Sequence, residues 1–501
     1  LLYMDKESLY VLNPFYHFRK EGDRVYLVSR SFCEEQESVN LEWRSVIHPV
    51  YAMLLSFFSM PISLKDGVLK VQAFFETTYE VAWNLVDKFV CNSEEMHSEY
   101  DGSISNFPKN VLVEASSKST FGRQYTPVDF KYDKLLMDEV RPDSAPFSLM
   151  VMFNNHCFTN CIYCYADKKS SCGQMPLEYF EKVLEEADRY EVSSLGVLGG
   201  EFFLYPHWRD VLEKMKGKCY MPNLISTKVP MREKDILDFG KYPIALQVSL
   251  DSVCQQTLDK MVGPISNYAK RMQESILSID KYRSDRKFQI ATVLTRYNGT
   301  IEELENLFAF VSRLKNLSRW EIRVGFKSLY SKSEFDVIKL PKERFSVIEE
   351  WIENKKKTSN MNILWSKGQN QNFFQAKDGA SSFVGARCSA NYSHMVILPN
   401  GDVTICEQLY WNPRFLLGNI VKQDISEIWN SPKALALAHR RAYSYSEDSS
   451  CKRCSLQEKC DSVQNKCYAN ILKVYGDEHW DYPDPRCCYA PRVEKAINSY
   501  F

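Results

Sequence analysis

The sequence predicts an α/β protein: a partial, TIM-like (β/α)6 barrel that follows a small α+β module and precedes a cysteine-rich domain. Three observations support this prediction. Six strand-like runs alternate with helical runs between residues 146 and 345, the first 110 residues lack that alternation, and eight of the 16 cysteines lie between Cys388 and Cys488. Strands that alternate with helices are most simply arranged as parallel βα units.

The first 110 residues are expected to form the α+β module, and residues 111–145 are expected to be a linker. Apolar alternation in residues 15–19 and 24–29 flanks the turn signal Glu21-Gly22-Asp23 and predicts a hairpin. Residues 46–58 and 77–90 carry apolar side chains at helical spacing. The apolar run at residues 68–75, between these two helices, predicts a strand.

The barrel is expected to span residues 146–345. Its six predicted strands are residues 147–153, 194–198, 223–228, 244–250, 288–295 and 320–326. Helical periodicity fills connections between them, at residues 177–190, 267–283 and 301–314. In such a barrel the chemistry lies at the C-terminal ends of the strands, where the βα loops meet. A bridging region, residues 346–384, leads to the cysteine-rich domain at residues 385–501.

Charge and composition exclude several classes of protein. The chain has 501 residues, and 63 Lys and Arg residues are balanced by 64 Asp and Glu residues, which argues against a strongly basic nucleic-acid binder. The most apolar stretch, residues 50–62, is shorter than the ~20 residues that a membrane helix needs. The N-terminus has neither the order of a secretory signal nor a Met at position 1. We therefore expect a cytoplasmic protein that binds neither nucleic acid nor membrane, with its native start upstream.

Sixteen cysteines without an export signal indicate metal or redox chemistry rather than disulfides. Twelve of them form two groups, four between Cys157 and Cys172 and eight between Cys388 and Cys488. The remaining four are scattered and are expected to be small buried hydrophobic residues: Cys33, Cys91, Cys219 and Cys254.

A loop directly after the first predicted barrel strand carries Cys157-x3-Cys161-x2-Cys164. A four-iron cluster is normally held by four thiolates, so a loop with three leaves one iron open. An open metal position can act as a Lewis acid toward a substrate or cofactor. Two other interpretations remain: a zinc site that His156 completes, or a group of buried thiols without a metal.

This spacing, with the aromatic Tyr163 before the last cysteine, resembles the signature of the radical S-adenosylmethionine (SAM) superfamily. The resemblance implies that Cys157, Cys161 and Cys164 hold a [4Fe-4S] cluster whose open iron chelates the amino and carboxylate groups of SAM. Electron transfer into the sulfonium would then give methionine and a 5′-deoxyadenosyl radical.

Two further segments fit the resemblance. Gly199-Gly200-Glu201 follows the second strand, and the family uses this motif to contact the SAM amino group; a turn with a solvated Glu is the simpler alternative. Ser249 and Asp251 end the fourth strand, where the family places polar contacts to SAM, and Asp251 is expected either to accept from ribose hydroxyls or to cap the next helix. The family often has Pro after the first motif and Gly after the Asp, where this chain has Phe202 and Ser252.

The C-terminal cysteines resemble the SPASM domain of radical SAM peptide maturases, in which seven cysteines bind two auxiliary [4Fe-4S] clusters. Six residues separate Cys460 from Cys467 where the family has three. The resemblance assigns Cys451, Cys454, Cys460 and either Cys487 or Cys488 to an outer cluster. It assigns Cys388, Cys406 and Cys467 to an inner cluster with an open iron or a non-cysteine ligand. A pair of zinc knuckles is the alternative.

The first module resembles, in predicted architecture, the winged-helix-like element with which peptide maturases bind a leader peptide through a sheet edge. A structural or dimerisation role is the alternative. The resemblance as a whole implies an oxidoreductase that abstracts hydrogen from a ribosomally made precursor peptide and closes a thioether or carbon–carbon crosslink. It also implies a low-potential electron donor such as a flavodoxin or ferredoxin. An enzyme that oxidises Ser or Cys, as sulfatase-maturing relatives do, and a non-catalytic zinc or iron-sulfur interaction protein are the other interpretations. No general acid or base is assigned.

Overall fold

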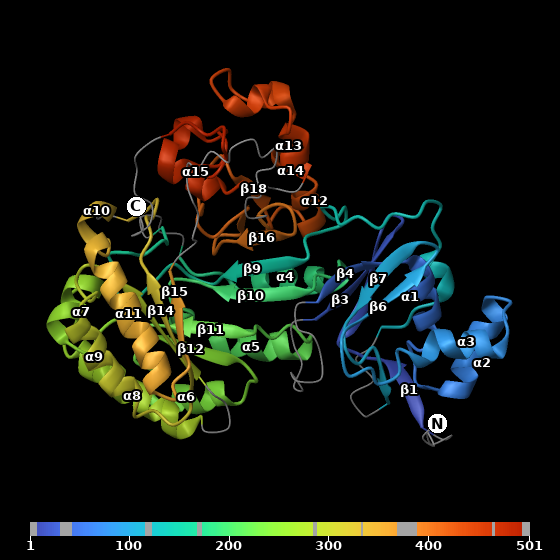
Figure 1. Cartoon of the computed structure of the whole chain (residues 1–501), viewed down its shortest axis with the longest axis horizontal. Coiled ribbons are helices and arrows are strands. Elements are labelled where there is room, and N and C mark those ends of the chain that lie inside the picture. The colour runs from blue at the N-terminus through green and yellow to red at the C-terminus, as the bar shows by residue number, and fades with distance from the viewer. Residues whose placement is uncertain are drawn as a thin grey trace. The chain divides into compact units, whose positions relative to one another are not determined.

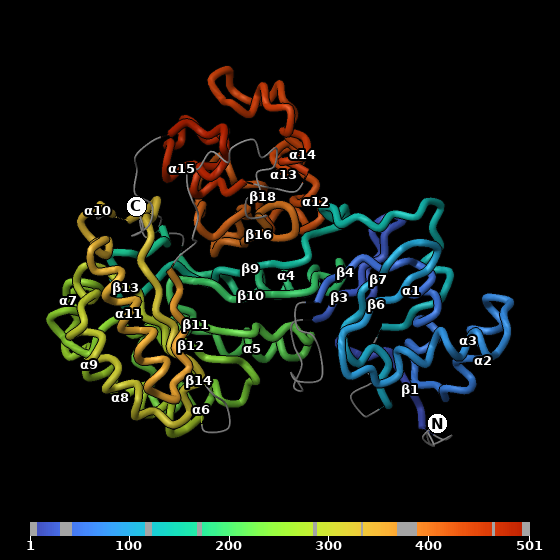
Figure 2. The backbone as a smooth tube through the Cα atoms, in the orientation of Figure 1, coloured from blue at the N-terminus to red at the C-terminus, as the bar shows by residue number. Residues whose placement is uncertain are grey.

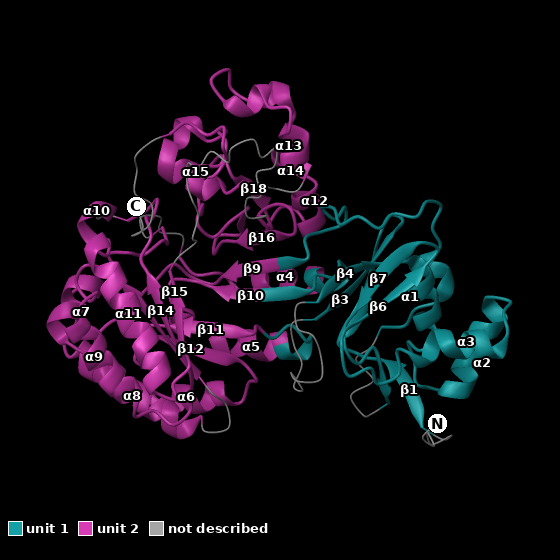
Figure 3. Cartoon of the chain, in the orientation of Figure 1, with its two compact units in different colours: residues 1–148, 187–195, 216–221 teal, residues 149–186, 196–215, 222–501 magenta. Residues whose placement is uncertain are grey.

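The structure, a computed structural model, describes residues 8–30, 43–115, 123–167, 173–283, 288–331, 334–367, 388–462 and 466–492, and everything below concerns these ranges. Figure 3 colours its two compact units. Unit 1 comprises residues 1–148, 187–195 and 216–221, and unit 2 comprises residues 149–186, 196–215 and 222–501.

Unit 1 contains short antiparallel strands and three helices around one apolar core. The strands are β1 (Leu9–Leu12), β2 (Tyr16–Glu21), β3 (Arg24–Ser29), β4 (Arg44–Ile47), β5 (Ile62–Ser63), β6 (Met96–Tyr100), β7 (Ser103–Phe107) and β8 (Leu112–Glu114). They form sheets in the orders β5-β1-β8, β2-β3-β4 and β6-β7. The helices are α1 (Pro49–Ser56), α2 (Leu64–Phe74) and α3 (Tyr79–Asp87). Phe18, Leu27 and Tyr51 are among the fully buried side chains of the core.

The predicted hairpin is confirmed, because β2 pairs with β3 from Tyr16–Ser29 to Glu21–Arg24. The first predicted helix starts later than its apolar pattern, at Pro49, since Val46 and Ile47 belong to β4. His48 caps it by accepting a hydrogen bond from Val50 N at Nδ1, 3.2 Å away. Residues 112–114 of the expected linker form β8, which pairs with β1.

The strand predicted at residues 68–75 is wrong, because these residues lie in α2. The helix begins before the apolar run, after Ser63, whose Oγ accepts from Asp66 N at 3.1 Å. Leu64, Val68 and Val71 are buried at the spacing of one helical face. Gly67 interrupts this pattern because the ring of Phe58 lies where a Cβ would be.

Unit 2 contains the barrel, and all six predicted strands are present. They are β9 (Ser148–Met152), β10 (Ser194–Leu198), β11 (Leu224–Thr227), β12 (Ala245–Ser249), β13 (Phe288–Leu294) and β14 (Leu317–Val324). The intervening helices are α4 (Leu177–Arg189), α5 (Trp208–Gly217), α6 (Glu233–Gly240), α7 (Gln255–Val262), α8 (Tyr268–Tyr282), α9 (Ile301–Val311) and α10 (Phe335–Ile338). Strands β11 to β14 are parallel neighbours, so their C-terminal ends lie at one edge.

The bridging region adds an element that the sequence did not predict. Helix α11 (Lys342–Thr358) leads into β15 (Ile363–Ser366), which pairs in parallel with β14 and extends the sheet to β11-β12-β13-β14-β15. The alternating strand pattern was too short there to be recognised, since β15 has four residues.

The cysteine-rich region continues the other barrel sheet. Its strands β16 (His394–Ile397), β17 (Asp402–Thr404) and β18 (Leu416–Asn419) follow β9 in the order β10-β9-β16-β17-β18, and β16 lies beside β9 in Figures 1 and 2. Its helices are α12 (Ile425–Trp429), α13 (Pro432–Ala438), α14 (Gln457–Ser462) and α15 (Tyr468–Tyr475). Glu186 of α4 accepts a hydrogen bond from Ile425 N at 2.9 Å, which joins α12 to the barrel.

Candidate active site

The loop with three cysteines follows β9 at the C-terminal edge of the barrel strands. The end of α7 holds it, because Asn160 N and Ile162 N donate to the carbonyls of Val262 and Met261 at 2.8 and 2.9 Å. Within the loop, Cys164 Sγ accepts from Ala166 N at 3.4 Å. These backbone contacts fix the loop while its thiols remain available as ligands.

The three thiols face one cavity of about 350 Å³, a size typical of small-molecule sites. Cys157, Cys161 and Cys164 line it together with Gly199, Gly200, Glu201, Tyr163 and Ser249, the residues that the sequence predicted to contact SAM. Asp251 does not line this cavity. The structure therefore brings residues from the loop after β9, the turn after β10 and the end of β12 to one place.

Asn154 connects the cysteine loop to the turn after β10. Its Oδ1 accepts from His156 N at 3.0 Å, its Nδ2 donates to the carbonyl of Glu201 at 3.0 Å, and its own carbonyl accepts from Gly200 N at 2.8 Å. The side chain is completely buried. Asn154 is therefore a positioning residue, and the sequence analysis did not identify it. The signal that could have indicated it is its place as a polar residue directly after a barrel strand.

Glu201 is a buried carboxyl group at the cavity wall rather than part of a solvated turn. Its Oε2 accepts from Thr227 Oγ1 at 2.8 Å and its Oε1 from Lys228 N at 2.6 Å. Burial raises the pKa of Glu201 to about 7, although these two hydrogen bonds act in the opposite direction. A carboxyl group held in this way can accept from an amino group once it is ionised.

Asp251 is engaged beneath the cavity by a lysine and a tyrosine. Lys228 Nζ and Tyr163 Oη both donate to Asp251 Oδ2, and Lys228 Nζ also donates to Tyr163 Oη at 2.6 Å. Asp251 Oδ1 accepts from Val293 N at 2.9 Å. Its side chain does not cap α7, whose N-cap is Cys254.

Lys228 was not recognised in the sequence, where it appears as one isolated lysine after a strand. Burial acts to lower its pKa, but Asp251 and Cys161 outweigh burial and the pKa is raised. The ammonium group is therefore charged and already paired with Asp251, and its side chain forms part of the cavity wall.

Three C-terminal cysteines form an inner group. Burial raises the pKa of Cys388 to about 12, with Cys467 as the second cause. Burial, followed by Glu407, raises the pKa of Cys406 well above its usual value, and Cys467 and Cys388 add to the effect. The three thiols are thus buried and influence one another's pKa, and the resemblance assigns them to one cluster.

Four other cysteines form an outer group. Burial raises the pKa of Cys460 to about 12, and Cys451 and Cys454 contribute. Burial also raises the pKa of Cys487 to about 12, with contributions from Cys488, Cys451 and Cys460. The resemblance assigns Cys451, Cys454, Cys460 and one member of the Cys487–Cys488 pair to one cluster.

The residues present fit iron–sulfur clusters by the chemistry of their donors. Buried thiols with raised pKa values are neutral, and bound iron would displace their protons. In the described part of the chain, no three His, Cys, Asp or Glu side chains converge closely enough to surround one metal ion. In a [4Fe-4S] cluster each thiolate binds a different iron, so the thiols must surround a space the size of the cluster rather than a single metal ion.

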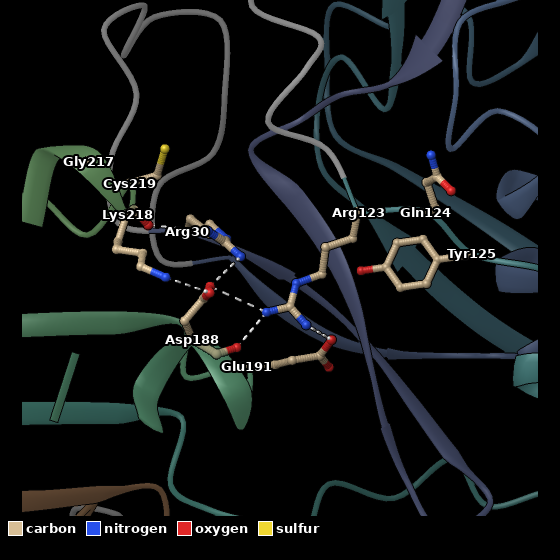
Figure 4. A pocket seen from close by; sticks show the side chains of 9 residues that line it. All are labelled: Arg30, Arg123, Gln124, Tyr125, Asp188, Glu191, Gly217, Lys218 and Cys219. Carbon is tan, nitrogen blue, oxygen red and sulfur yellow. Dashed lines mark hydrogen bonds and ion pairs between the residues drawn. The ribbon is translucent and has the colours of Figure 1, made fainter. Parts of the chain in front are cut away.

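A separate cavity of about 480 Å³ lies in unit 1 (Figure 4). Asp188 is its centre: Arg30 Nη2, Arg123 Nη2 and Lys218 Nζ lie 3.3, 3.5 and 3.4 Å from its Oδ atoms. Arg123 also pairs with Glu191. Each charged residue of this lining pairs with one of opposite charge, which is typical of a structural ion-pair network.

Two family models match the chain in the regions just described. The radical SAM superfamily model matches residues 151–314, and the SPASM model, an iron-sulfur cluster-binding domain, matches residues 388–455. The fold and the cysteine-lined cavity thus define a radical SAM enzyme, with SAM and more than one [4Fe-4S] cluster as cofactors. The match of the SPASM model, together with that of the radical SAM model, confirms the resemblance read from the cysteine spacing.

Comparison with individual proteins gives one curated relative and a set of similar structures. The chain is 21% identical over 339 residues to the antilisterial bacteriocin subtilosin biosynthesis protein AlbA of Bacillus subtilis (strain 168), covering 66% of this chain and 68% of AlbA. Streptococcus suis SuiB bound to precursor peptide SuiA has a TM-score of 0.62 at 16% identity, covering 95% of this chain and 99% of SuiB. SuiB bound to S-adenosylmethionine has a TM-score of 0.59 at 16% identity, covering 95% and 98%. The likeness to SuiB confirms the fold over nearly the whole chain.

Among the described residues, no helix has the length and apolar character that a membrane crossing requires.

Proposed function

We propose that the protein is a radical SAM peptide maturase that abstracts hydrogen from a ribosomally made precursor peptide and forms a thioether or carbon–carbon crosslink. The observation that carries the proposal is the single cavity shared by three cysteines of the loop after β9 and by the Gly199-Gly200-Glu201 turn. AlbA, a bacteriocin biosynthesis protein, and SuiB, which has been crystallised with a precursor peptide, support a peptide as the substrate.

In this proposal, Cys157, Cys161 and Cys164 hold the first cluster, which together with SAM supplies the 5′-deoxyadenosyl radical. Glu201 accepts from the SAM amino group, and Asn154 keeps Glu201 in register with the cysteine loop. Lys228 and Asp251 neutralise each other, and this ion pair holds the Lys228 side chain in the cavity wall.

The auxiliary domain would hold two more clusters. Cys388, Cys406 and Cys467 are the proposed ligands of the inner cluster, and Cys451, Cys454, Cys460 and Cys487 those of the outer cluster. Crosslink formation leaves one electron to be removed, and the auxiliary clusters would receive it. A low-potential donor such as a flavodoxin or ferredoxin is part of the proposal, and so is a cytoplasmic location, because clusters and free thiols require a reducing compartment.

Unit 1 offers a candidate site for the leader of the precursor. A cleft of about 410 Å³ is lined by Trp43, Arg44 and Ser45 at β4 and by Glu95, Met96, His97 and Asn106 at the β6–β7 hairpin. Strand edges on both sides would supply backbone donors and acceptors to an extended peptide, and Trp43 and Met96 would supply apolar contacts. This cleft supports the leader-recognition role expected from the sequence.

Anaerobic reconstitution tests the proposal. The wild-type protein should contain about twelve irons with matching sulfide and should convert SAM to methionine and 5′-deoxyadenosine under reductant. Replacement of Cys157, Cys161 or Cys164 by Ala should abolish SAM cleavage. Cys91→Ala should leave it unchanged, because Cys91 is an exposed thiol of unit 1 rather than the buried residue that the sequence predicted. Zinc without sulfide would refute the proposal. A Trp43→Ala variant should retain SAM cleavage and lose modification of a full precursor.

A further inference from the structure

Strand β14 contributes one cationic side chain, that of Arg323, to the wall of the cysteine-lined cavity. The SAM contacts proposed above do not involve it. Arg323 lines the cavity, and 40% of its side chain is accessible. Lys228, the other cationic residue of the lining, is already bound to Asp251. The turn with Glu201 follows β10, which belongs to a different sheet from β14. Arg323 also pairs with a carboxylate, that of Glu321, but it is the more accessible of the two cationic residues of the lining.

The guanidinium of Arg323 is held in place but not satisfied. Its Nη2 donates to Gln247 Oε1 at 3.2 Å and to Glu321 Oε2 at 2.9 Å. Its Nε is buried and donates to no described group. A buried donor without a partner is uncommon in native proteins and often marks the place of a group that is absent from the structure.

Positive charge exceeds negative charge along β14. Arg319 lies four residues before Arg323 on the same face of β14, and it donates through Nε and Nη2 to Gln289 Oε1 at 3.0 and 2.6 Å. Among the described residues Arg319 forms no ion pair, whereas Arg323 pairs with Glu321 at 2.9 Å. Gln247 and Gln289 are uncharged and act as spacers, with Gln289 Nε2 donating to Gln247 Oε1 at 3.4 Å. The excess positive charge on β14 therefore belongs to Arg319, which does not line the cavity, while Glu321 balances Arg323.

We infer that Arg323 recognises an acidic side chain, Asp or Glu, of the peptide segment that enters the cavity. A guanidinium presents a planar fork that matches a carboxylate, and the Gln247 and Glu321 contacts orient that fork in advance. The inference rests on the proposed function and names a feature of its substrate. The carboxylate of SAM is the competing occupant of Arg323, and the experiment must separate the two.

The probes are two N-acetylated, C-amidated pentapeptides that differ only in a central Glu or Gln, added to the reconstituted holoenzyme with SAM. We expect the wild-type protein to bind the Glu peptide at least tenfold more tightly, and Arg323→Gln to remove this preference. Arg319→Gln is the matched control, because it removes a guanidinium of the same strand that does not line the cavity. The control should retain the preference for Glu.

The affinity for SAM, measured without peptide, separates the two occupants. It should be the same in the wild type and in Arg323→Gln. Equal binding of the two pentapeptides by the wild type, or an equal preference in Arg323→Gln, would overturn the inference. A loss of SAM affinity in Arg323→Gln would also overturn it and would assign Arg323 to the SAM carboxylate. Formation of 5′-deoxyadenosine without peptide reports on the proposed function independently of all these outcomes.

Discussion

The carbonyl oxygen of His156 lies 2.1 Å from the position that a Cβ of Gly200 would occupy. The backbone of the turn after β10 thus contacts the backbone of the cysteine loop after β9. Gly200 is required because this close approach leaves no room for a Cβ, and not because of an unusual dihedral angle. Backbone atoms cannot move aside as a flexible side chain can, so any side chain at residue 200 must displace the cysteine loop.

Gly200→Ala should therefore damage the first cluster and leave the auxiliary clusters intact. We expect the iron content to fall from about twelve to about eight per chain and SAM cleavage to be lost. Iron and sulfide analysis with EPR of the reduced protein measures both. Gly240→Ala, in α6 where a Cβ meets no atom, is the control and should be neutral or stabilising by about 0.5–1 kcal/mol. Normal SAM cleavage by Gly200→Ala would contradict the proposed contact.

The sequence predicted the barrel strands well, because apolar runs at regular intervals are a local pattern, and the cysteine spacing predicted the two regions that the family models match. It did not identify Asn154, Lys228 or Arg323, each of which is an isolated polar residue in its own segment. Their roles depend on parallel pairing that brings distant strand ends to one cavity, which no short pattern encodes. The error in α2 has a similar cause, since Gly67 is explained only by the ring of Phe58.

Lys228→Met should destabilise unit 2 strongly, by about 3–5 kcal/mol, because it leaves the buried carboxylate of Asp251 without its cation. Tyr163→Phe removes one donor to the same carboxylate and should cost less, about 1–3 kcal/mol. Urea denaturation followed by tryptophan fluorescence measures both. Lys270→Met, at an exposed lysine of α8, should change stability by less than about 0.5 kcal/mol. Equal effects of Lys228→Met and Lys270→Met would show that the buried pair does not stabilise the barrel.

Glu201 should make SAM binding depend on pH in the neutral range. Its pKa in the folded protein is about 7, and the ionised carboxylate accepts from the SAM amino group more strongly than the neutral acid does. The affinity for SAM should therefore decrease up to about tenfold for each pH unit below 7 and be constant above pH 8. Equilibrium dialysis between pH 5.5 and 8.5 measures this dependence, and Glu201→Gln should bind more weakly with a flat profile. A sloping profile in that variant would assign the titration to another group.

The same pKa has the opposite consequence for the stability of the protein without SAM. The folded pKa of Glu201, about 7, exceeds the ordinary value of 4.5, so the folded state binds this proton more tightly than the unfolded state does. The resulting stabilisation, about 3 kcal/mol, is complete below pH 4.5 and is lost as the pH rises through 7. The difference in unfolding free energy between the wild type and Glu201→Gln should therefore depend on pH within this window. A difference that is independent of pH would contradict the buried, protonated state.

Single replacements should distinguish the ligands of the two auxiliary clusters. Cys467→Ala should remove the inner cluster and Cys487→Ala the outer one, each lowering the iron content to about eight per chain. Cys488→Ala should retain about twelve irons if Cys487 is the fourth ligand of the outer cluster, as proposed. Iron retention by Cys487→Ala together with iron loss in Cys488→Ala would reverse this assignment.

The ion-pair network of unit 1 should stabilise the protein in a manner that depends on pH. Burial raises the pKa of Glu191, and Arg123 opposes this shift, so Arg123→Met should raise the pKa further. When the pKa of a carboxyl group is higher in the folded state than in the unfolded state, the group stabilises the protein at pH values below the unfolded pKa, here near 4.5. This stabilisation is lost as the pH rises through the folded pKa. Arg123→Met should thus lower the free energy of unfolding by about 1–3 kcal/mol at pH 8 and by less at pH 5.

Lys218→Met is the control, because the half-exposed ammonium of Lys218 lies 3.4 Å from Asp188 and solvent screens that pair. It should lower the free energy of unfolding by at most about 1 kcal/mol at either pH. Equal losses for Arg123→Met at pH 5 and pH 8 would mean that Glu191 is ionised without its arginine and that solvent, rather than Arg123, compensates its charge.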